Sequence, residues 1–403
     1  MAAEEPQAAP APGRPRPVRL AVIATQWGRI GCIGFGGPPA HIALLRALCV
    51  DREGWLSAAE FEDGVAATNL LPGPASTQLA IFCAWRLAGP AGALVGGVCF
   101  IGPGLIIILA LAGVFLAARP PLWIRGAAAG AGAAVPAVAV SAAIGLMPAS
   151  WRRAGDAAVG RRRWVGYLLA SGLAAVLAGP FVAAVLAASG LLEVTARGLL
   201  RRGGQPGRAG PPGALLPLLA GPAVAAGTLA SVAWVGFKVG ALSYGGGFVI
   251  IPLMQHDAVH TYHWMTSAQF LSAVALGQVT PGPVVQTVAV VGFAAAGAGG
   301  GLLASLVAFA PSFAFVLAGA PRFGRLRANP AVQAFLTGSG PAAIGAIAGS
   351  AVPLGLSLAH LWQLGVLALA AGWLIALRRN VVAAIGAAAA AGVIAALAGA
   401  AVG

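Results

Sequence analysis

The sequence predicts an all-α, polytopic membrane protein made of two homologous repeats. Of its 403 residues, 59% are hydrophobic and only 8% are charged, whereas soluble domains carry about 25% charged residues. The stretch 34–74 occurs a second time at 243–283, and Gly/Pro motifs interrupt both copies. These observations predict two inverted repeats with broken or re-entrant helices at the Gly-Gly-Pro and Pro-Gly-Pro motifs.

The two copies match without a gap. Each opens on an aromatic-Gly-Gly motif, at 35–37 and at 244–246, and each closes on Pro-Gly-Pro, at 72–74 and at 281–283. The offset is 209 at both ends (244 − 35 and 281 − 72). A constant offset between two distant motifs indicates an internal duplication.

Composition excludes several functional classes. The net charge is +14, but the basic residues lie in short clusters between apolar runs, which is the positive-inside pattern of membrane proteins. The sequence has no metal-ligand spacing, no nucleophile elbow and no phosphate-binding loop with lysine. We therefore expect no nucleic-acid partner, no metal, no cofactor and no enzymatic activity.

Apolar runs give the order of the remaining elements. Runs that suit a spanning helix, or a tight pair of short ones, occur at 89–118, 126–147, 164–196, 215–231, 298–320, 331–352, 358–377 and 381–402. We expect a disordered tail without a signal peptide (1–20), a first repeat (21–196), a basic linker with an extra span (197–231) and a second repeat (232–403).

Arginine placement predicts the orientation. Residues 150–163 carry five arginines, whereas the corresponding turn at 357–363 carries no Lys or Arg. The positive-inside rule places the first of these turns and the N-terminus in the cytoplasm, and it inverts the second repeat. Arg119 and Arg125 run against this scheme. We expect a multi-pass protein of the cytoplasmic membrane.

The interrupted segments 21–50 and 58–88 admit two interpretations. Basic residues flank 21–50 on both sides, so this segment dips into the bilayer and returns, or else both segments are kinked spans of full length. An arm of a dozen residues reaches ~20 Å, which is about the bilayer middle. Ser57 followed by Glu60 is a capping box that would start the second re-entrant arm.

Each break begins a new helix inside the membrane. The unpaired N–H groups of a helix start attract anions, Pro suits the first turn, and Gly lets a ligand approach the backbone. The alternative for each break is a kink that improves packing. The breaks predicted to bind substrate contain Gly36, Gly37, Pro38, Pro72, Gly73, Pro74, Tyr244, Gly245, Gly246, Pro281, Gly282 and Pro283.

Two cations precede the aromatic-Gly-Gly motifs at the same distance. Arg29 lies seven residues before Gly36, and Lys238 lies seven before Gly245, again at an offset of 209 (238 − 29). Cations within apolar helices are expensive and usually functional, so this pair is a candidate for binding the substrate anion. The alternative is that both side chains extend to the lipid headgroups.

The polar lining is sparse. Asn69 and Gln278 are repeat partners in front of the Pro-Gly-Pro motifs, and Gln78 and Thr280 lie close by. These side chains either bind an oxyanion or hydrogen bond neighbouring helices. The candidates for proton coupling are His41, Glu60 and Asp63, for which packing, capping and solvation are the alternatives.

The motifs resemble those of the chromate ion transporter family. The runs GFGGPPAHIALL at 34–45 and LLPGP at 70–74 are similar to its first half, and YGGG at 244–247 and GQVTPGP at 277–283 are similar to its second half. The resemblance implies a two-domain antiporter that exports chromate, with sulfate as the structural analogue, at the expense of the proton-motive force. Asn69 departs from the glutamine more usual in the family.

Two other functions remain open from the sequence. The chain would then carry another oxyanion, such as sulfate, without a role in chromate resistance, or it would be a membrane scaffold or sensor that transports nothing. The expected partners are chromate or sulfate, protons and the lipid bilayer. A homodimer is compatible with the sequence.

Overall fold

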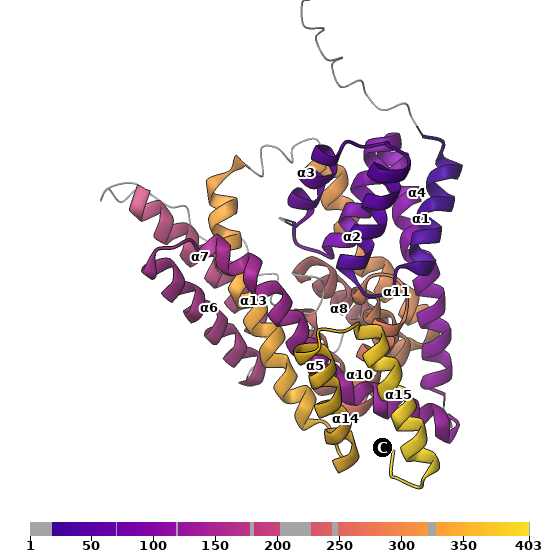
Figure 1. Cartoon of the computed structure of the whole chain (residues 1–403). Helices are drawn as coiled ribbons and strands as arrows, with labels where there is room; N and C mark the ends of the chain where they lie inside the picture. Colours follow the sequence, from indigo (N-terminus) through magenta and orange to yellow (C-terminus); the bar gives the residue numbers. More distant parts are fainter. Residues whose placement is uncertain are drawn as a thin grey trace, which may run out of the picture.

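The computed structural model describes residues 18–69, 71–117, 120–177, 181–201, 227–243, 249–320 and 328–402, and these contain helices and no strands. Figure 1 shows the arrangement. The helices of the first half are α1 (Leu20–Ile33), α2 (Pro38–Arg46), the π-helix η1 (Ala47–Arg52), α3 (Ala58–Thr68), α4 (Ala75–Phe115), α5 (Leu122–Ala154), α6 (Ala158–Leu177) and α7 (Val182–Arg201).

The second half repeats this order. Its π-helix η4 lies 209 residues after η1 (256 − 47 and 261 − 52). The helices are α8 (Thr228–Leu242), α9 (Ile250–Gln255), η4 (His256–Thr261), α10 (Ser267–Val279), the 3₁₀ turn η5 (Val284–Gln286), α11 (Thr287–Gly319), α13 (Pro330–Leu356), α14 (Leu361–Ala371), η7 (Gly372–Ala376) and α15 (Val381–Leu397).

The predicted all-α, membrane-spanning class is confirmed. Within the described residues, four helices are long and apolar enough to cross a membrane: α4, α5, Val284–Gly319 and α13. The run 164–196 forms the pair α6 and α7. Most of the predicted extra span 215–231 lies outside the described residues, and its last four residues form the first turn of α8.

The long helices α4 and α11 carry matching kinks. Ala88 and Gly89 have φ/ψ of −146°/26° and 61°/−153°, and Ala296 and Gly297 have −151°/32° and 63°/−159°. A positive φ with ψ near −155° is accessible essentially to glycine alone. Each kink divides its helix into a short arm that begins at a Pro-Gly-Pro motif and a long arm that follows.

The short arms form helical hairpins. Glu60, at the start of α3, forms an ion pair with Arg86, near the end of the short arm of α4. The N–H of Val18 donates to Leu87 O, so the start of α1 also lies at this end of the hairpin. The Pro-Gly-Pro motif at 72–74 is therefore at the tip. The capping box predicted at Ser57 is present.

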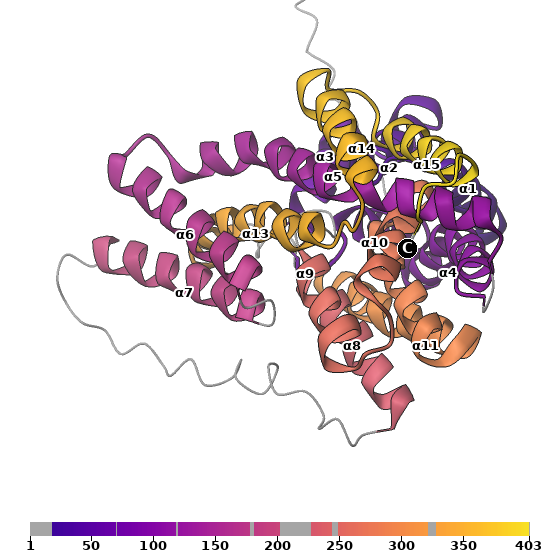
Figure 2. The same ribbon diagram turned by 90° about the horizontal axis from the view of Figure 1, so that it is seen from below.

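The last helices of each half pack against the other half. Helix α5 lies against α14 and α15, and α13 lies against α6 and α7, as Figure 2 shows. Small residues permit this approach: a Cβ atom on Gly130 would lie 2.1 Å from Ala388 O, and one on Gly349 would lie 2.3 Å from Gly172 O. Helices from the two halves therefore pack closely through small residues at these crossings.

Candidate functional site

The breaks of the two halves are joined by a reciprocal pair of hydrogen bonds. The N–H of Gly73 donates to Ser243 O at 2.5 Å, and the N–H of Gly282 donates to Gly34 O at 3.0 Å. Both donors and both acceptors are repeat partners (282 − 73 and 243 − 34 both equal 209). Each Pro-Gly-Pro tip therefore contacts the end of the first helix of the opposite half, and segments distant in sequence meet at one place.

The long arms of α4 and α11 close this centre in the same symmetric way. A Cβ atom on Gly104 of α4 would lie 2.0 Å from Pro281 O. Ser312 of α11 occupies the corresponding place, where its Oγ lies 3.1 Å from the position of a Cβ on Gly73. The centre is thus lined by both tips and both long helices.

His41 lies at this centre and is fully buried. Its Nε2 is 2.9 Å from Gly34 O, the same carbonyl that accepts from Gly282, and its Nδ1 is 3.1 Å from Ser76 Oγ. In the Nε2–H tautomer the imidazole donates to the carbonyl and accepts from the hydroxyl. The ring therefore connects the first turn of α4 to the joint between the halves.

Several buried polar atoms near the tips have no hydrogen-bond partner among the described residues. Gln78 donates from Nε2 to Pro72 O at 2.7 Å, and Gln286 donates from Nε2 to Ile101 O at 2.8 Å. The Oε1 atoms of both side chains are left without a donor. Buried polar groups normally find partners, so such a cluster is typical of a hydrated or ligand-binding site. The atoms are Thr77 Oγ1, Gln78 Oε1, Ser243 Oγ, Gln278 Nε2, Gln286 Oε1 and Ser312 Oγ.

A pocket of about 90 Å³ reaches the tip of the first half. Asn69 and Gly73 line it on one side, and Ala75 exposes the start of α4, where the first N–H groups have no partner within the helix. The opposite wall comes from α5, with Ser150 and Arg153, and from α13. The guanidinium of Arg153 provides positive charge beside the start of a helix, which favours an anion.

The two tips differ in access. Asn69 and Pro72 of the first tip are exposed, and Gly73 and Pro74 are buried. In the second tip Thr280, Pro281, Gly282 and Pro283 are all buried. The structure is therefore open at the first tip and closed at the second.

The two predicted cations lie in different surroundings. The Lys238 side chain is 13% exposed, and its Nζ forms an ion pair with Asp257 Oδ2 at 2.5 Å. Arg29 is exposed on α1, and no ion pair to it occurs within the described residues. The roles of both in anion binding stay predictions.

The remaining predicted residues fall into three groups. Gly36 and Gly37 have positive φ, and Gly37 caps α2, which begins at Pro38. Glu60 and Asp63 lie on α3, and Glu60 is held by its capping box and by Arg86, at the end of the hairpin remote from the tip. Tyr244, Gly245 and Gly246 lie outside the described residues.

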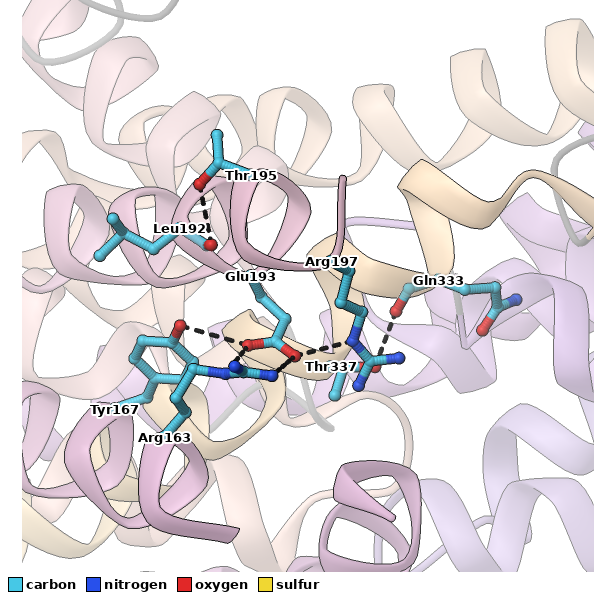
Figure 3. Close-up of polar contacts among 8 residues, drawn as sticks. All are labelled: Arg163, Tyr167, Leu192, Glu193, Thr195, Arg197, Gln333 and Thr337. Atoms are coloured by element: carbon cyan, nitrogen blue, oxygen red, sulfur yellow. Dashed lines mark hydrogen bonds and ion pairs between the residues drawn. The ribbon is translucent and has the colours of Figure 1, made fainter. Parts of the chain in front are cut away.

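A second polar cluster supports the wall of the pocket from behind. Figure 3 shows the Glu193 carboxylate between two arginines: Arg163 donates from Nε at 2.9 Å and Nη2 at 3.2 Å, and Arg197 donates from Nε at 2.7 Å. Tyr167 adds a hydrogen bond at 3.3 Å. Because Gly338 of α13 packs directly on the Glu193 Cβ, the cluster fixes α6, α7 and α13 together.

Four of the site residues that the sequence analysis did not single out are Asp257, Glu193, Arg153 and Ser312. Glu193 is an acid inside an apolar stretch, and Asp257 is one of only 10 acids in the chain, so their rarity was a usable signal. Arg153 is one of several arginines in a turn, and Ser312 is a single hydroxyl in a long apolar helix, so neither stands out without the fold.

The comparisons with known proteins agree with this architecture. A family model described as "Chromate transporter" matches residues 21–194 and 230–393, which lie in the two halves. A chromate transport protein of Cupriavidus metallidurans is 32% identical over 339 residues, covering 81% of this chain and 80% of that protein. A probable chromate transport protein of Synechococcus elongatus is 30% identical, covering 86% and 88%. A chromate transport protein of Pseudomonas aeruginosa is 30% identical, covering 84% and 82%. No solved structure matches the chain.

Proposed function

We infer, from the premise that this chain belongs to the chromate transporter family, that it carries chromate out of the cytoplasm at the expense of the proton-motive force. Membership makes it a multi-pass membrane transporter and not an enzyme. The direction, the energy source and the binding site are our proposals. Sulfate has the same tetrahedral shape and double charge, so we propose it as a second substrate.

The reciprocal hydrogen bonds from Gly73 and Gly282 are the observation that carries the proposal. They bring helix starts from both halves to one centre, and helix starts inside a membrane offer N–H groups and positive potential. Thr77 and Ser312 add hydroxyls, and Gln278 adds an amide, that are able to donate to an oxyanion. A doubly charged anion away from bulk water needs such donors.

We propose that the substrate occupies this centre and the adjoining pocket. The binding set consists of the two tips, the Gly36-Gly37-Pro38 break and its counterpart at 244–246, together with Asn69, Gln78 and Gln278. His41 is the proton-coupling candidate that lies closest to this set, because it contacts Gly34 O. Arg153 is added as the cation at the pocket.

Alternating access follows from the difference between the tips. We propose two repeats, 21–196 and 232–403, inverted across the bilayer, with the hairpins re-entrant and their tips near its middle. The arginine-rich turn at 150–163 would place the open tip toward the cytoplasm. Closure of the first tip and opening of the second would then release the anion outside.

A sulfate transporter without chromate transport is the second candidate. The hydroxyls and the Gln278 amide at the centre are able to donate hydrogen bonds, and Arg153 adds positive charge at the pocket. These groups recognise a tetrahedral dianion and not chromium itself. The scaffold alternative has no such support, because a scaffold needs no cluster of unpaired donors beside helix starts.

Flux in proteoliposomes tests the function. We expect saturable uptake of chromate by counterflow against internal chromate, inhibition by sulfate, and net flux that follows an imposed membrane potential or pH gradient. Variant Gly282→Val, purified in the same way, is expected to show at least tenfold less counterflow. Sulfate counterflow without chromate counterflow favours the second candidate, and the absence of both contradicts transport of either anion.

A further inference from the structure

A buried ion pair lies beside the centre in the second half only. Lys238 Nζ and Asp257 Oδ2 are 2.5 Å apart, with side chains 13% and 7% exposed. Lys238 lies five residues before Ser243, the residue whose carbonyl accepts from the Gly73 tip. At 1.5 Å per residue the ammonium-bearing turn is therefore ~8 Å along the helix axis from the joint between the halves.

The first half has no equivalent of this pair. The repeat partner of Asp257 is Leu48 (257 − 209), and the partner of Lys238 is the exposed Arg29. A packing role common to both halves would not need an ion pair in only one of them. Because the ion pair occurs in one half only, the duplication does not explain it.

Few other ionisable groups face the pair. Helix α8 packs on α11 through Gly236 and Gly240, and Thr287–Gly319 contains no ionisable residue. On η4 and just beyond it lie His256, His260 and Tyr262, and Trp234 of α8 holds its ring 5.7 Å from Lys238 Nζ. The charge of Lys238 is therefore balanced mainly by Asp257.

The charge state of Asp257 would change the positive charge beside the centre. While Asp257 is ionised, it neutralises the ammonium, and an approaching dianion gains little from the pair. If Asp257 takes up a proton, its carboxylate becomes a neutral acid and the positive charge of Lys238 is uncompensated. In a region of low effective dielectric this charge strongly favours an anion.

We propose that Asp257, and not His41, is the proton site of this transporter and that it acts by releasing Lys238 to the substrate oxyanion. The inference rests on the proposed transport of chromate or sulfate. In the step, a hydronium ion transfers its proton to the Asp257 carboxylate: one O–H bond of hydronium breaks, one O–H bond forms on the acid, and water leaves. The ammonium then turns from the neutral acid to the anion. Proton and anion therefore bind together.

Because the proton and the anion bind together, they also cross the membrane in the same direction. A dianion that leaves with one proton still carries one negative charge outward, so an inside-negative membrane potential drives its export. The proton then travels with chromate, which is the opposite of antiport. An alkaline interior slows export instead of driving it.

Sulfate binding as a function of pH tests the proposal. Sulfate is the better probe because it stays doubly charged from mildly acidic to mildly alkaline pH, whereas chromate itself takes up a proton. In purified full-length protein we expect sulfate affinity, measured by thermal stabilisation, to rise as pH falls, by up to about tenfold per pH unit for one linked proton. Asp257→Asn should bind sulfate with an affinity independent of pH, and Lys238→Gln should bind it weakly throughout.

Two controls protect the result from misfolding. Asp156→Asn removes an exposed carboxylate of a surface ion pair with Arg161 and should keep the wild-type pH dependence. The double variant Lys238→Gln/Asp257→Asn leaves no buried charge unpaired and should fold, bind weakly and lose the pH dependence. Proton uptake by weakly buffered wild-type protein on addition of sulfate, close to one per anion, needs no variant at all.

The failures are distinguishable. Wild-type pH dependence in Asp257→Asn, or affinity that rises with pH in the wild type, overturns the role of Asp257 while transport stands. Proton release on sulfate addition overturns it as well. If neither sulfate nor chromate binds to wild-type protein at any pH, the proposed function itself fails.

Discussion

Glycine at positions 73 and 282 is required by backbone shape and by space. Their φ angles are 126° and 107°, where side chains are strained. A Cβ atom on Gly73 would also lie 2.3 Å from Gln78 Nε2, and one on Gly282 would lie 3.0 Å from Gln286 Oε1. Both residues donate the hydrogen bonds that join the halves, so conformation and function coincide at these positions.

Gly73→Val and Gly282→Val are expected to lower chromate counterflow at least tenfold, because a branched side chain displaces the neighbouring glutamine and blocks the N–H groups of the tip. The matched control is Gly145→Val on α5, where a Cβ atom meets nothing within 4 Å. Counterflow is measured in proteoliposomes and normalised to reconstituted protein. Wild-type flux in either tip variant would remove that tip from the site.

A comparison of Arg153 with its neighbour Arg152 distinguishes a charge that acts at the pocket from the general positive charge of the turn. Both are exposed, but only Arg153 lines the pocket at the first tip. Arg153→Gln should raise the KM for sulfate by about tenfold at low salt and by less at high salt, since exposed charges are screened. Arg152→Gln should keep the wild-type KM. Equal effects of the two substitutions would assign the charge to orientation in the membrane.

The residues predicted from sequence were those with a local or duplicated signal. Gly/Pro breaks are visible in one dimension, and the offset of 209 makes their pairing visible too. Asp257 was not found because its repeat partner is Leu48, so a comparison of the two copies hides it. Its partner Lys238 was found, but the ion pair depends on how η4 packs beside α8, which no spacing reveals.

At the level of elements, the kinks in α4 and α11 determine where each tip lies. They occur at Gly89 and Gly297, where a Cβ atom would meet nothing within 4 Å. Space therefore does not require glycine at either position, and the requirement comes from φ of 61° and 63° alone. The sequence predicted the long apolar arms of these helices, but it did not reveal the bend at the start of each arm, because Ala-Gly is common in both halves.

Gly89→Ala and Gly297→Ala should each lower stability by ~1–3 kcal/mol through backbone strain. Gly102→Ala in the long arm of α4, where the backbone is helical and the added Cβ also has open space, should be neutral or slightly stabilising. Thermal unfolding of the detergent-solubilised proteins measures the difference. Equal melting temperatures for all three variants would show that the kink tolerates an ordinary residue.

In the whole molecule, each half packs helices against the other half, so the halves are not two separate domains side by side. Helix α5 of the first half packs on α14 and α15, and α13 of the second packs on α6 and α7. The sequence predicted the two repeats but not this packing between them, because a repeat pattern shows which segments are alike and not which are in contact. The two pairings are nonetheless equivalent, as a molecule with pseudo-twofold symmetry requires.

The proposed inversion of the repeats predicts that equivalent turns face opposite sides of the membrane. In a variant without the four native cysteines, Asp156→Cys between α5 and α6 should react with an impermeant thiol reagent from the cytoplasmic side. Ser357→Cys, between α13 and α14, should react from the outside only. Labelling of both cysteines from one side would contradict the inverted arrangement, whatever the transport activity.

The packing of helices between the halves also has a consequence for biosynthesis. Helix α5 is complete at Ala154, but its partner α14 begins only at Leu361. Roughly 200 residues must therefore be added first, which takes about 10–40 s at ribosomal rates of 5–20 residues per second. During that time the face of α5 that carries Gly126 and Gly130 lies in the membrane without α15, the helix on which it packs in the complete protein. The nascent chain thus depends on the membrane-insertion machinery, or on transient substitute contacts, for longer than a protein whose halves fold one after the other.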